Sequence, residues 1–361
     1  MLPRALATVR AAAKTTTFFL KVLPMLPSGP IDRLTGTPVV ERVRYPTRAG
    51  EVDGDLYRPS GPGPHPGMVV CLGVVPFEVD HPQVPVLGRA LARSGFAALL
   101  HWSPAMRAFR LEPEDVADVA LAYRWLIDRP DIDAERSGLL GTCVGGSFAL
   151  MAAASPLIRD RVAFVTEWAA YSSMWTLAQD IASATRPSGG SREPWQVDPL
   201  TRKVYVHSMT ATLAPAEAEL LRSGMAERTG RVGEGALSAD GRAICTLLGA
   251  LDAGAAERAL HLLPLTFQRR LDDLSPLNYV KDIRAPLIVL AHDRDDEVIP
   301  LAESRQLWPV LAGRPGAHYT ELGMFQHMDP SKRRVSPPVM IRELIRFFLF
   351  VYPVFRQAVR S

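Results

Sequence analysis

The sequence predicts an α/β protein, in which helices flank a mostly parallel central sheet and a helical cap is inserted into the chain. Three observations indicate this class. Residues 67–75 (G-M-V-V-C-L-G-V-V) form a continuous apolar run, which is typical of a strand buried on both faces of a parallel sheet. Strand-like and helix-like stretches alternate on both sides of this run. The alternation stops near residue 174 and resumes near residue 273.

The first half of the core shows this rhythm most clearly. Residues 39–57 alternate apolar and polar side chains about a turn near Gly50, which predicts a hairpin. Helix-like and strand-like stretches then follow one another as far as the glycine-rich turn at residue 141 and the strand beyond it. The predicted elements are a helix at 84–94, a strand at 96–102, a helix at 113–128, a strand at 138–140 and a strand at 162–167.

The insertion shows helical patterns and no obvious strand alternation. We expect a polar loop at 185–191 and helices at 216–228, 242–251 and 255–263. The core then resumes with strands at 286–291 and 317–321, a helix at 302–311 and a final helix at 338–352. Residues 347–352 are apolar on every side, so we expect them to pack against protein or lipid, with the N-terminal helix as one candidate partner.

The 361 residues therefore divide into three predicted parts. No secretory signal is expected at the start, because Lys21 and Pro24 interrupt the only apolar run there, and no stretch approaches the roughly 20 apolar residues that span a bilayer. The parts are a helical extension at 1–38, an α/β core at 39–173 and 273–361, and the cap insertion at 174–272.

Charge is distributed unevenly along the chain. The net charge is +3, but residues 1–30 carry +4 and residues 331–361 carry +6, which leaves −7 for the rest. A nucleic-acid-binding domain would be basic throughout, so we expect no such partner. Arg10, Lys14 and Lys21 fall on one helical face. The N-terminal helix is therefore expected either to pack on the body or to contact an anionic membrane surface peripherally.

The cysteine content indicates a reducing compartment. Cys71, Cys143 and Cys245 are odd in number and widely spaced, so no disulfide framework is expected, and a cytoplasmic location follows. No spacing of His, Cys and carboxylate residues matches a metal site, and no cofactor is predicted.

Residues 137–154 predict a strand, a tight turn and a helix with Cys143 at the apex. The turn reads G-T-C-V-G-G, with Gly141 and Gly145 two residues to either side of the thiol. This is the G-x-S-x-G nucleophile elbow with Cys in place of Ser. A thiol at a helix N-terminus is favoured as its thiolate, so Cys143 is predicted to be a nucleophile rather than a buried structural cysteine.

A nucleophilic cysteine needs a base, and the base needs an acid that orients it. Two later strand ends supply candidates in the order acid then histidine, which accompanies this elbow. The first is the segment H-D-R-D-D-E-V-I-P after residue 291, and the second is the loop L-G-M-F-Q-H-M-D-P after residue 321. The candidates are Asp293, Asp295 and Asp296 as acid, and His327 as base with His292 as its competitor.

These pieces together resemble the α/β-hydrolase superfamily, and most of all its dienelactone hydrolase-like group, whose elbow carries Cys. The resemblance rests on I-D-A-E-R-S-G-L-L-G-T-C-V-G-G, on S-P-L-N-Y-V-K-D-I-R-A-P-L-I-V-L before D-x-V-I-P, and on the late histidine. It covers residues from about 40 to 174 and 273 to 350. It implies a triad of Cys143, Asp296 and His327, with the backbone N–H groups of Val144 and Val74 as the oxyanion hole.

Other side chains at strand ends are expected to face the same pocket, which the cap would cover as a lid. They are His101, Trp102, Glu167, Trp168 and Tyr171.

The cysteine also restricts the predicted chemistry. A thiolate leaves a tetrahedral adduct more readily than an ordinary alkoxide, so productive acyl transfer favours thioesters, enol lactones and other activated esters. The leading hypothesis is a hydrolase of such a substrate, for which amides should be poor substrates and a hydrophobic acyl group is expected. Two alternatives are an acyltransferase or polyester-synthase-like enzyme that uses the same cysteine, and a lapsed hydrolase that binds lipid or membrane.

Overall fold

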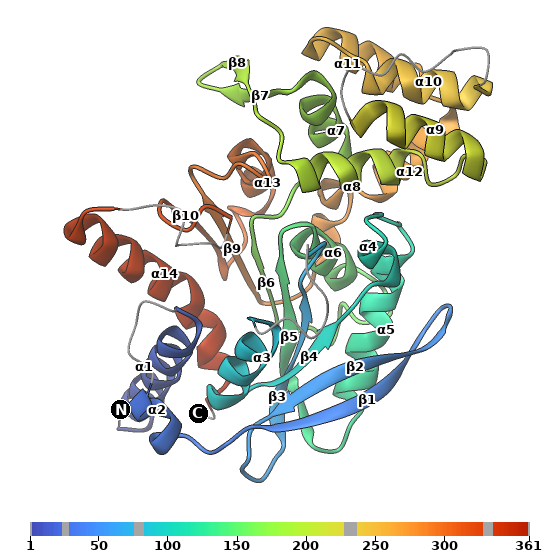
Figure 1. The fold of residues 1–361 in the computed structure, drawn as a ribbon. Coiled ribbons are helices and arrows are strands. Elements are labelled where there is room, and N and C mark those ends of the chain that lie inside the picture. The colour runs from blue at the N-terminus through green and yellow to red at the C-terminus, as the bar shows by residue number, and fades with distance from the viewer. Residues whose placement is uncertain (1, 24–28, 76–82, 227–236, 328–334, 360–361) are drawn as a thin grey trace.

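An eight-stranded sheet runs through the protein and confirms the predicted fold class (Figure 1). The computed structural model describes residues 2–23, 29–75, 83–226, 237–327 and 335–359. The strand order is β1-β2-β4-β3-β5-β6-β9-β10. β1 pairs antiparallel with β2, and β2 pairs antiparallel with β4, whereas every other neighbouring pair is parallel.

The elements of the core follow the predicted order, with boundaries moved by a few residues. The strands are β1 (Val39–Thr47), β2 (Gly50–Arg58), β3 (His65–Cys71), β4 (Ala97–His101), β5 (Ile132–Thr142), β6 (Phe164–Trp168), β9 (Leu287–Asp293) and β10 (Ala317–Leu322). The helices are α1 (Leu2–Val22), α2 (Gly29–Leu34), α3 (Gln83–Arg93), α4 (Pro104–Arg107), α5 (Asp115–Ile127), α6 (Val144–Ala153), α13 (Leu301–Leu311) and α14 (Pro337–Gln357), with short 3₁₀ turns at Pro276–Asn278 and Val280–Asp282.

Helices cover both faces of the sheet, because successive side chains of each central strand point to opposite sides. On one face α5, α6 and α13 pack against Val69, Leu139, Val165 and Ile288. On the other face α1, α3 and α14 pack against Met68, Val70, Val289 and Ala291. The central strands are therefore buried on both sides, as their continuous apolar runs predict.

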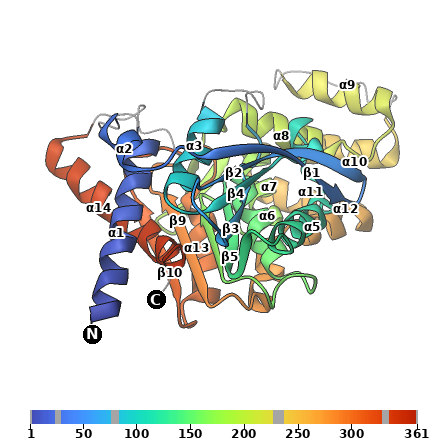
Figure 2. The same ribbon diagram turned by 90° about the horizontal axis from the view of Figure 1, so that it is seen from below.

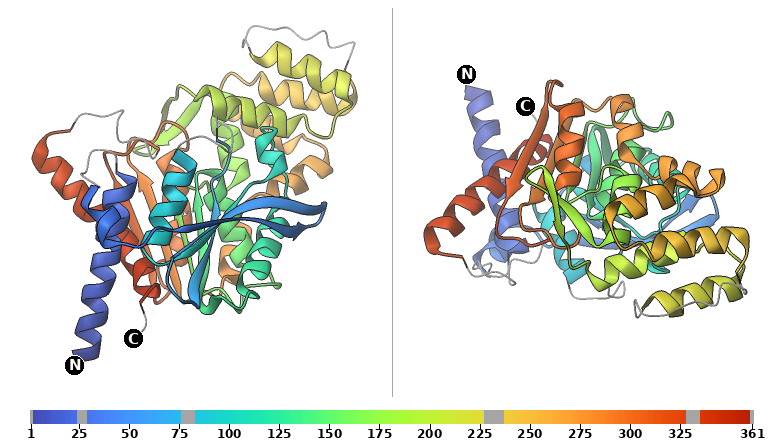
Figure 3. Two further views of the ribbon diagram at one scale, coloured as in Figure 1. Left: turned by 60° about the horizontal axis from the view of Figure 1, so that its bottom comes forward. Right: turned by 90° about the horizontal axis from the view of Figure 1, so that it is seen from above.

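The insertion forms a cap at one end of the sheet (Figures 1 and 3). It consists of α7 (Met174–Ser183), β7 (Thr185–Ser188), β8 (Ser191–Pro194), α8 (Pro199–Met209), α9 (Pro215–Ala226), α10 (Ala239–Leu248), α11 (Ala253–His261) and α12 (Leu265–Asp273).

The polar loop predicted at 185–191 is wrong, because these residues belong to the β7–β8 hairpin. Gly189 and Gly190 form its two-residue turn with φ values of 56° and 87°. Such a turn requires positive φ at both positions, which glycine adopts without steric cost. The S-G-G-S sequence carried this signal, but the polar flanks concealed it.

Hydrogen bonds fasten the cap to the core. The Glu303 carboxylate on α13 accepts hydrogen bonds from the backbone N–H groups of Ser172 and Ser173, at 2.8 and 3.0 Å, where the chain enters α7. Trp195, just after β8, donates its indole N–H to the carbonyl oxygen of Glu297 at 3.0 Å. The cap therefore holds the loop that follows β9.

The N-terminal helix packs along α14 (Figure 2). The rings of Phe18 and Phe355 lie 5.0 Å apart, and those of Phe19 and Phe347 lie 4.7 Å apart. Two of the three cations on the predicted basic face are engaged with the protein, in agreement with the first alternative, packing on the body. Lys14 donates to the carbonyl oxygen of Ser94 at 3.0 Å, and Lys21 lies 2.5 Å from Asp32. Among the described residues, no helix is both long and apolar enough to cross a bilayer.

Candidate active site

Cys143 occupies a sharp turn between β5 and α6. Its backbone has φ of 55° and ψ of −138°, a combination that residues with a Cβ atom rarely adopt. Its N–H donates to the carbonyl oxygen of Trp168 at 2.8 Å, which ties the turn to the end of β6. Strained backbone of this kind persists where surrounding structure enforces it, and it is concentrated at functional sites.

The glycines around Cys143 allow the turn to close. A Cβ atom on Gly141 would lie 2.4 Å from the carbonyl oxygen of Gly145. A Cβ atom on Gly145 would lie 2.2 Å from the carbonyl oxygen of Cys71. Both distances are too short for any side chain, so β5, α6 and the end of β3 approach as closely as they do only because these positions are glycine.

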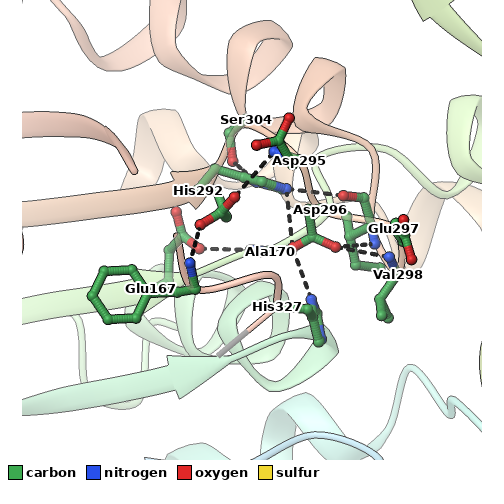
Figure 4. A network of polar contacts seen from close by, with 12 residues as sticks. Glu167, Ala170, His292, Asp295, Asp296, Glu297, Val298, Ser304 and His327 are labelled. Atoms are coloured by element: carbon green, nitrogen blue, oxygen red, sulfur yellow. Dashed lines mark hydrogen bonds and ion pairs between the residues drawn. The ribbon is translucent and has the colours of Figure 1, made fainter. Parts of the chain in front are cut away.

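Asp296, in the loop after β9, lies between the side chains of His292 and His327 (Figure 4). Its side chain is only 1% exposed. One carboxylate oxygen, Oδ1, accepts the N–H groups of Val298 and Ile299 at 2.8 and 2.9 Å, and Oδ2 accepts the Nδ1–H of His327 at 2.8 Å. Burial opposes ionisation, but the His327 charge and the hydrogen bonds outweigh it and hold the pKa of Asp296 below its ordinary value.

His327 connects this carboxylate to the thiol. Because a carboxylate only accepts hydrogen bonds, the proton shared with Asp296 resides on Nδ1, which leaves Nε2 for the Cys143 side chain, with which the ring also hydrogen-bonds. Burial lowers the pKa of His327, but the charges of Cys143 and Asp296 outweigh burial and raise that pKa well above its ordinary value. The ring is thus placed to hold a proton beside the sulfur.

The competing acids and histidine have other partners. Asp293 accepts the N–H groups of Phe325 and Asp295, at 2.6 and 3.0 Å, and so joins the two loops. Asp295 is exposed. His292 is completely buried, with Nδ1 2.7 Å from the Ser304 hydroxyl and Nε2 2.9 Å from the carbonyl oxygen of Ile299. Burial lowers the pKa of His292, so this ring is neutral and packs behind the acid.

The residues predicted for the oxyanion hole lie on two backbones that meet beside Cys143. Val144 is the first residue of α6, so its N–H has no partner within the helix. Val74 follows Gly73, whose φ is 76° and whose added Cβ would lie 2.9 Å from the backbone nitrogen of Gly145. Both valines line the same cavity as Cys143 and His327.

This cavity has a volume of about 1170 Å³ and extends beneath the cap. Glu167 and Trp168 line it, but His101, Trp102 and Tyr171 do not, which corrects the expectation for these three. His101 turns toward Tyr45, 2.9 Å away, while Trp102 and Tyr171 are buried within apolar clusters. A position at a strand end does not determine which face a side chain points to.

Glu167 is a carboxyl group on the cavity wall near the elbow, and its side chain is only 1% exposed. Its Oε2 atom accepts the N–H of Ala170 at 2.8 Å, while Oε1 has no hydrogen-bond partner among the described residues (Figure 4). Burial raises the pKa of Glu167 to about 8, so its side chain is a neutral carboxylic acid at pH 7. Such a group can donate a hydrogen bond as well as accept one.

Sequence reasoning missed the contribution of the N-terminal and C-terminal helices to this cavity. Phe18, Val22 and Leu23 of the N-terminal segment line it, together with α14 residues that include Phe350 and Val351. The apolar 347–352 segment predicted burial with the N-terminal helix as one candidate partner, and the packing of α1 on α14 confirms this, but the segment gave no sign that both helices would line a cavity. In the part of the chain that the structure describes, no three His, Cys, Asp or Glu side chains gather as a metal ion would require.

Comparisons with known proteins agree with this architecture. No family model matches the chain. A probable 2-oxo-3-(5-oxofuran-2-ylidene)propanoate lactonase of Bradyrhizobium is 33% identical over 125 residues, which cover 30% of this chain and 49% of the lactonase. Acyl-coenzyme A thioesterase 6 of Mus musculus is 32% identical over 126 residues, which cover 33% of this chain and 27% of that protein. The chain thus spans about half or less of the curated relatives it matches.

Among solved structures, the Pyrococcus horikoshii acylaminoacyl peptidase aligns with 90% of this chain and 43% of its own, with a TM-score of 0.51 and 18% identity. At this level of sequence identity, the similarity is evidence for a shared fold and not for a shared activity. Together with the strand order and the elbow between β5 and α6, it shows that the chain has the α/β-hydrolase fold.

Proposed function

We propose that the chain is a hydrolase of activated acyl substrates, namely thioesters, enol lactones or activated esters, and that Cys143 is its nucleophile. The observation that carries the proposal is the line of hydrogen bonds from the Cys143 side chain through His327 to the buried Asp296. The lactonase and the thioesterase that the chain resembles support the substrate class.

In the first half of the proposed reaction, the Cys143 thiolate attacks the acyl carbon while His327 holds the proton. The negative oxygen that forms lies at the N–H groups of Val144 and Val74. The bond to the leaving group then breaks, and His327 gives its proton to the departing sulfur or oxygen. The acyl group remains on Cys143 as a thioester.

In the second half, water replaces the leaving group. His327 takes a proton from the water, whose oxygen attacks the thioester carbon. Collapse of the adduct releases the carboxylic acid, and His327 returns the proton to the Cys143 sulfur. Asp296 keeps the same tautomer of His327 available in both halves, because it accepts only from Nδ1.

The test is a panel of p-nitrophenyl esters, an enol lactone and acyl-CoA thioesters, assayed with and without iodoacetamide. We expect turnover that iodoacetamide abolishes, and at least about a 10³-fold loss in kcat/KM for Cys143→Ala and His327→Ala. Cys245→Ala is the matched control, because it removes a thiol of the cap and should retain wild-type turnover. Turnover that survives in Cys143→Ala would exclude the proposed nucleophile.

A further inference from the structure

The residues that line the cavity with Cys143 fall into two groups, one in the core and one under the cap, and we treat the space beside each group as a branch. We call the first the core branch, because it lies in the layer between the sheet and the helices α1, α3 and α14. We call the second the cap branch, because it lies beneath α7, α8 and α12. The core branch is lined by Phe18, Met68, Leu91, Val351, Val354 and Phe355, and the cap branch by Leu177, Ile181, Val204, Phe267 and Arg270.

The six side chains named for the core branch are all apolar and largely buried. Met68 of β3 and Leu91 of α3 are at most 1% exposed, and Val351, Val354 and Phe355 of α14 are at most 8% exposed. A water molecule there would find no hydrogen-bond partners among these side chains, whereas each buried methylene group of an alkyl chain gains about 0.8 kcal/mol. The branch is therefore suited to a flexible hydrocarbon chain.

The cap branch also has apolar side chains, but two charged residues, Asp198 and Arg270, line it as well. Asp198 caps α8 and accepts the N–H groups of Leu200 and Thr201 at 2.9 and 3.1 Å. The guanidinium group of Arg270 lies 2.6 Å from Glu112. This asymmetry in charge favours a polar leaving group on the cap side of Cys143, since Lys21 of α1, which also lines the cavity, is already paired with Asp32.

From this asymmetry we infer that the core branch is the acyl-chain site, and that the substrates are thioesters or esters of long unbranched aliphatic acids. This inference rests on the proposed function. The carbonyl carbon lies at the Cys143 sulfur, the chain runs between β3 and α14, and the leaving group points toward the cap. The helices α1 and α14 are therefore part of the substrate-binding site.

The test compares hexadecanoyl-CoA with butanoyl-CoA. Val351→Trp fills the middle of the core branch, and Leu349→Trp is the matched control on the same helix, since Leu349 is 62% exposed. We expect wild type and Leu349→Trp to prefer hexadecanoyl-CoA in kcat/KM. In Val351→Trp the ratio of the two kcat/KM values should fall at least about tenfold, which corresponds to two methylene groups denied burial. An unchanged ratio would overturn the inference.

A second variant and a binding measurement keep the inference testable if Val351→Trp folds poorly. Val354→Phe adds less volume and should lower the same ratio to a smaller extent. Titration calorimetry with hexadecanoate should show binding to Cys143→Ala and about three- to tenfold weaker binding when Val354→Phe is added. Binding without any acylation of Cys143 would refute the proposed function but support the chain site. Acylation of Cys143 with no preference for chain length would support the proposed function but refute the chain site.

Discussion

Asp296 and Asp295 are neighbours in the sequence but differ in burial and in hydrogen bonding, which bear on which of them is the acid of the proposed triad. Asp296 is buried and accepts three hydrogen bonds, whereas Asp295 is exposed. A carboxamide at position 296 could present its NH₂ group to Nδ1 and so favour the wrong tautomer of His327. The assignment of the acid is therefore open to a paired substitution.

We expect Asp296→Asn to lower kcat/KM by about 10²- to 10⁴-fold, because Nε2 would then carry the proton that should come from Cys143. Asp295→Asn should stay within about threefold of wild type, since it changes an exposed side chain. Both variants would be assayed on one thioester, with melting temperatures measured to confirm folding. Equal losses in the two variants, or a larger loss in Asp295→Asn, would assign the acid elsewhere.

The raised pKa of Glu167 predicts how the free energy of unfolding depends on pH. In the unfolded chain it ionises near its ordinary pKa of 4.5, and in the folded protein near 8. Between these values the folded state binds one proton more than the unfolded state, so this residue lowers the free energy of unfolding as pH rises from about 5 to about 8. Above pH 8 its effect is constant.

Glu167→Gln keeps the acceptor for Ala170 and removes the titration. We expect the melting temperature of this variant to exceed that of wild type by a margin that grows from pH 5 to pH 8, as followed by thermal denaturation. Glu321→Gln is the control, because the pKa of Glu321 is lowered by its hydrogen bond to Arg305, and no such growing margin should arise. A margin that is constant over this range would show that Glu167 is not neutral in the folded protein.

At the scale of elements, α1 is a component of the core rather than an appendage. Phe19 is 7% exposed and contacts the rings of Phe347 and Phe348 on α14. Because α14 packs in turn on β9 and β10, the N-terminal helix supports the layer that contains the core branch.

We expect Phe19→Ala to reduce the free energy of unfolding by about 3–5 kcal/mol, the usual cost of removing a buried phenylalanine ring. Leu6→Ala, at a position that is 51% exposed on the same helix, should change it by less than about 0.5 kcal/mol. Urea denaturation of the two variants measures both values. A similar small effect in both would mean that α1 is not packed as described.

The elements also show what a single sequence can predict. The core strands and helices could be predicted because apolar runs and glycine-rich turns act locally, as residues 67–75 and the Cys143 elbow illustrate. The β7–β8 hairpin could not be recognised from its polar strands. The sequence did not show that His101, Trp102 and Tyr171 point away from the cavity, because their direction depends on which neighbour each strand end packs against. The wall that α1 and α14 give the cavity arises from tertiary packing between the two ends of the chain.

At the scale of the whole molecule, the cavity connects three regions that are far apart in the sequence. The elbow and the histidine loop belong to the α/β core, the cap closes one side, and the chain's first and last helices form the other. The cap also holds the acid loop through Trp195. Substrate binding and the alignment of the triad are therefore expected to depend on the same cap contacts.

The central claim is that an acyl group passes through the Cys143 sulfur. The most direct measurement is intact-protein and peptide mass spectrometry after rapid acid quenching of wild type mixed with acyl-CoA or p-nitrophenyl ester. We predict an adduct with the mass of the acyl group on the peptide that contains Cys143, absent in Cys143→Ala and formed more slowly in His327→Ala. Turnover of these substrates with no adduct at any quench time, or an adduct that persists at another residue in Cys143→Ala, would contradict the account.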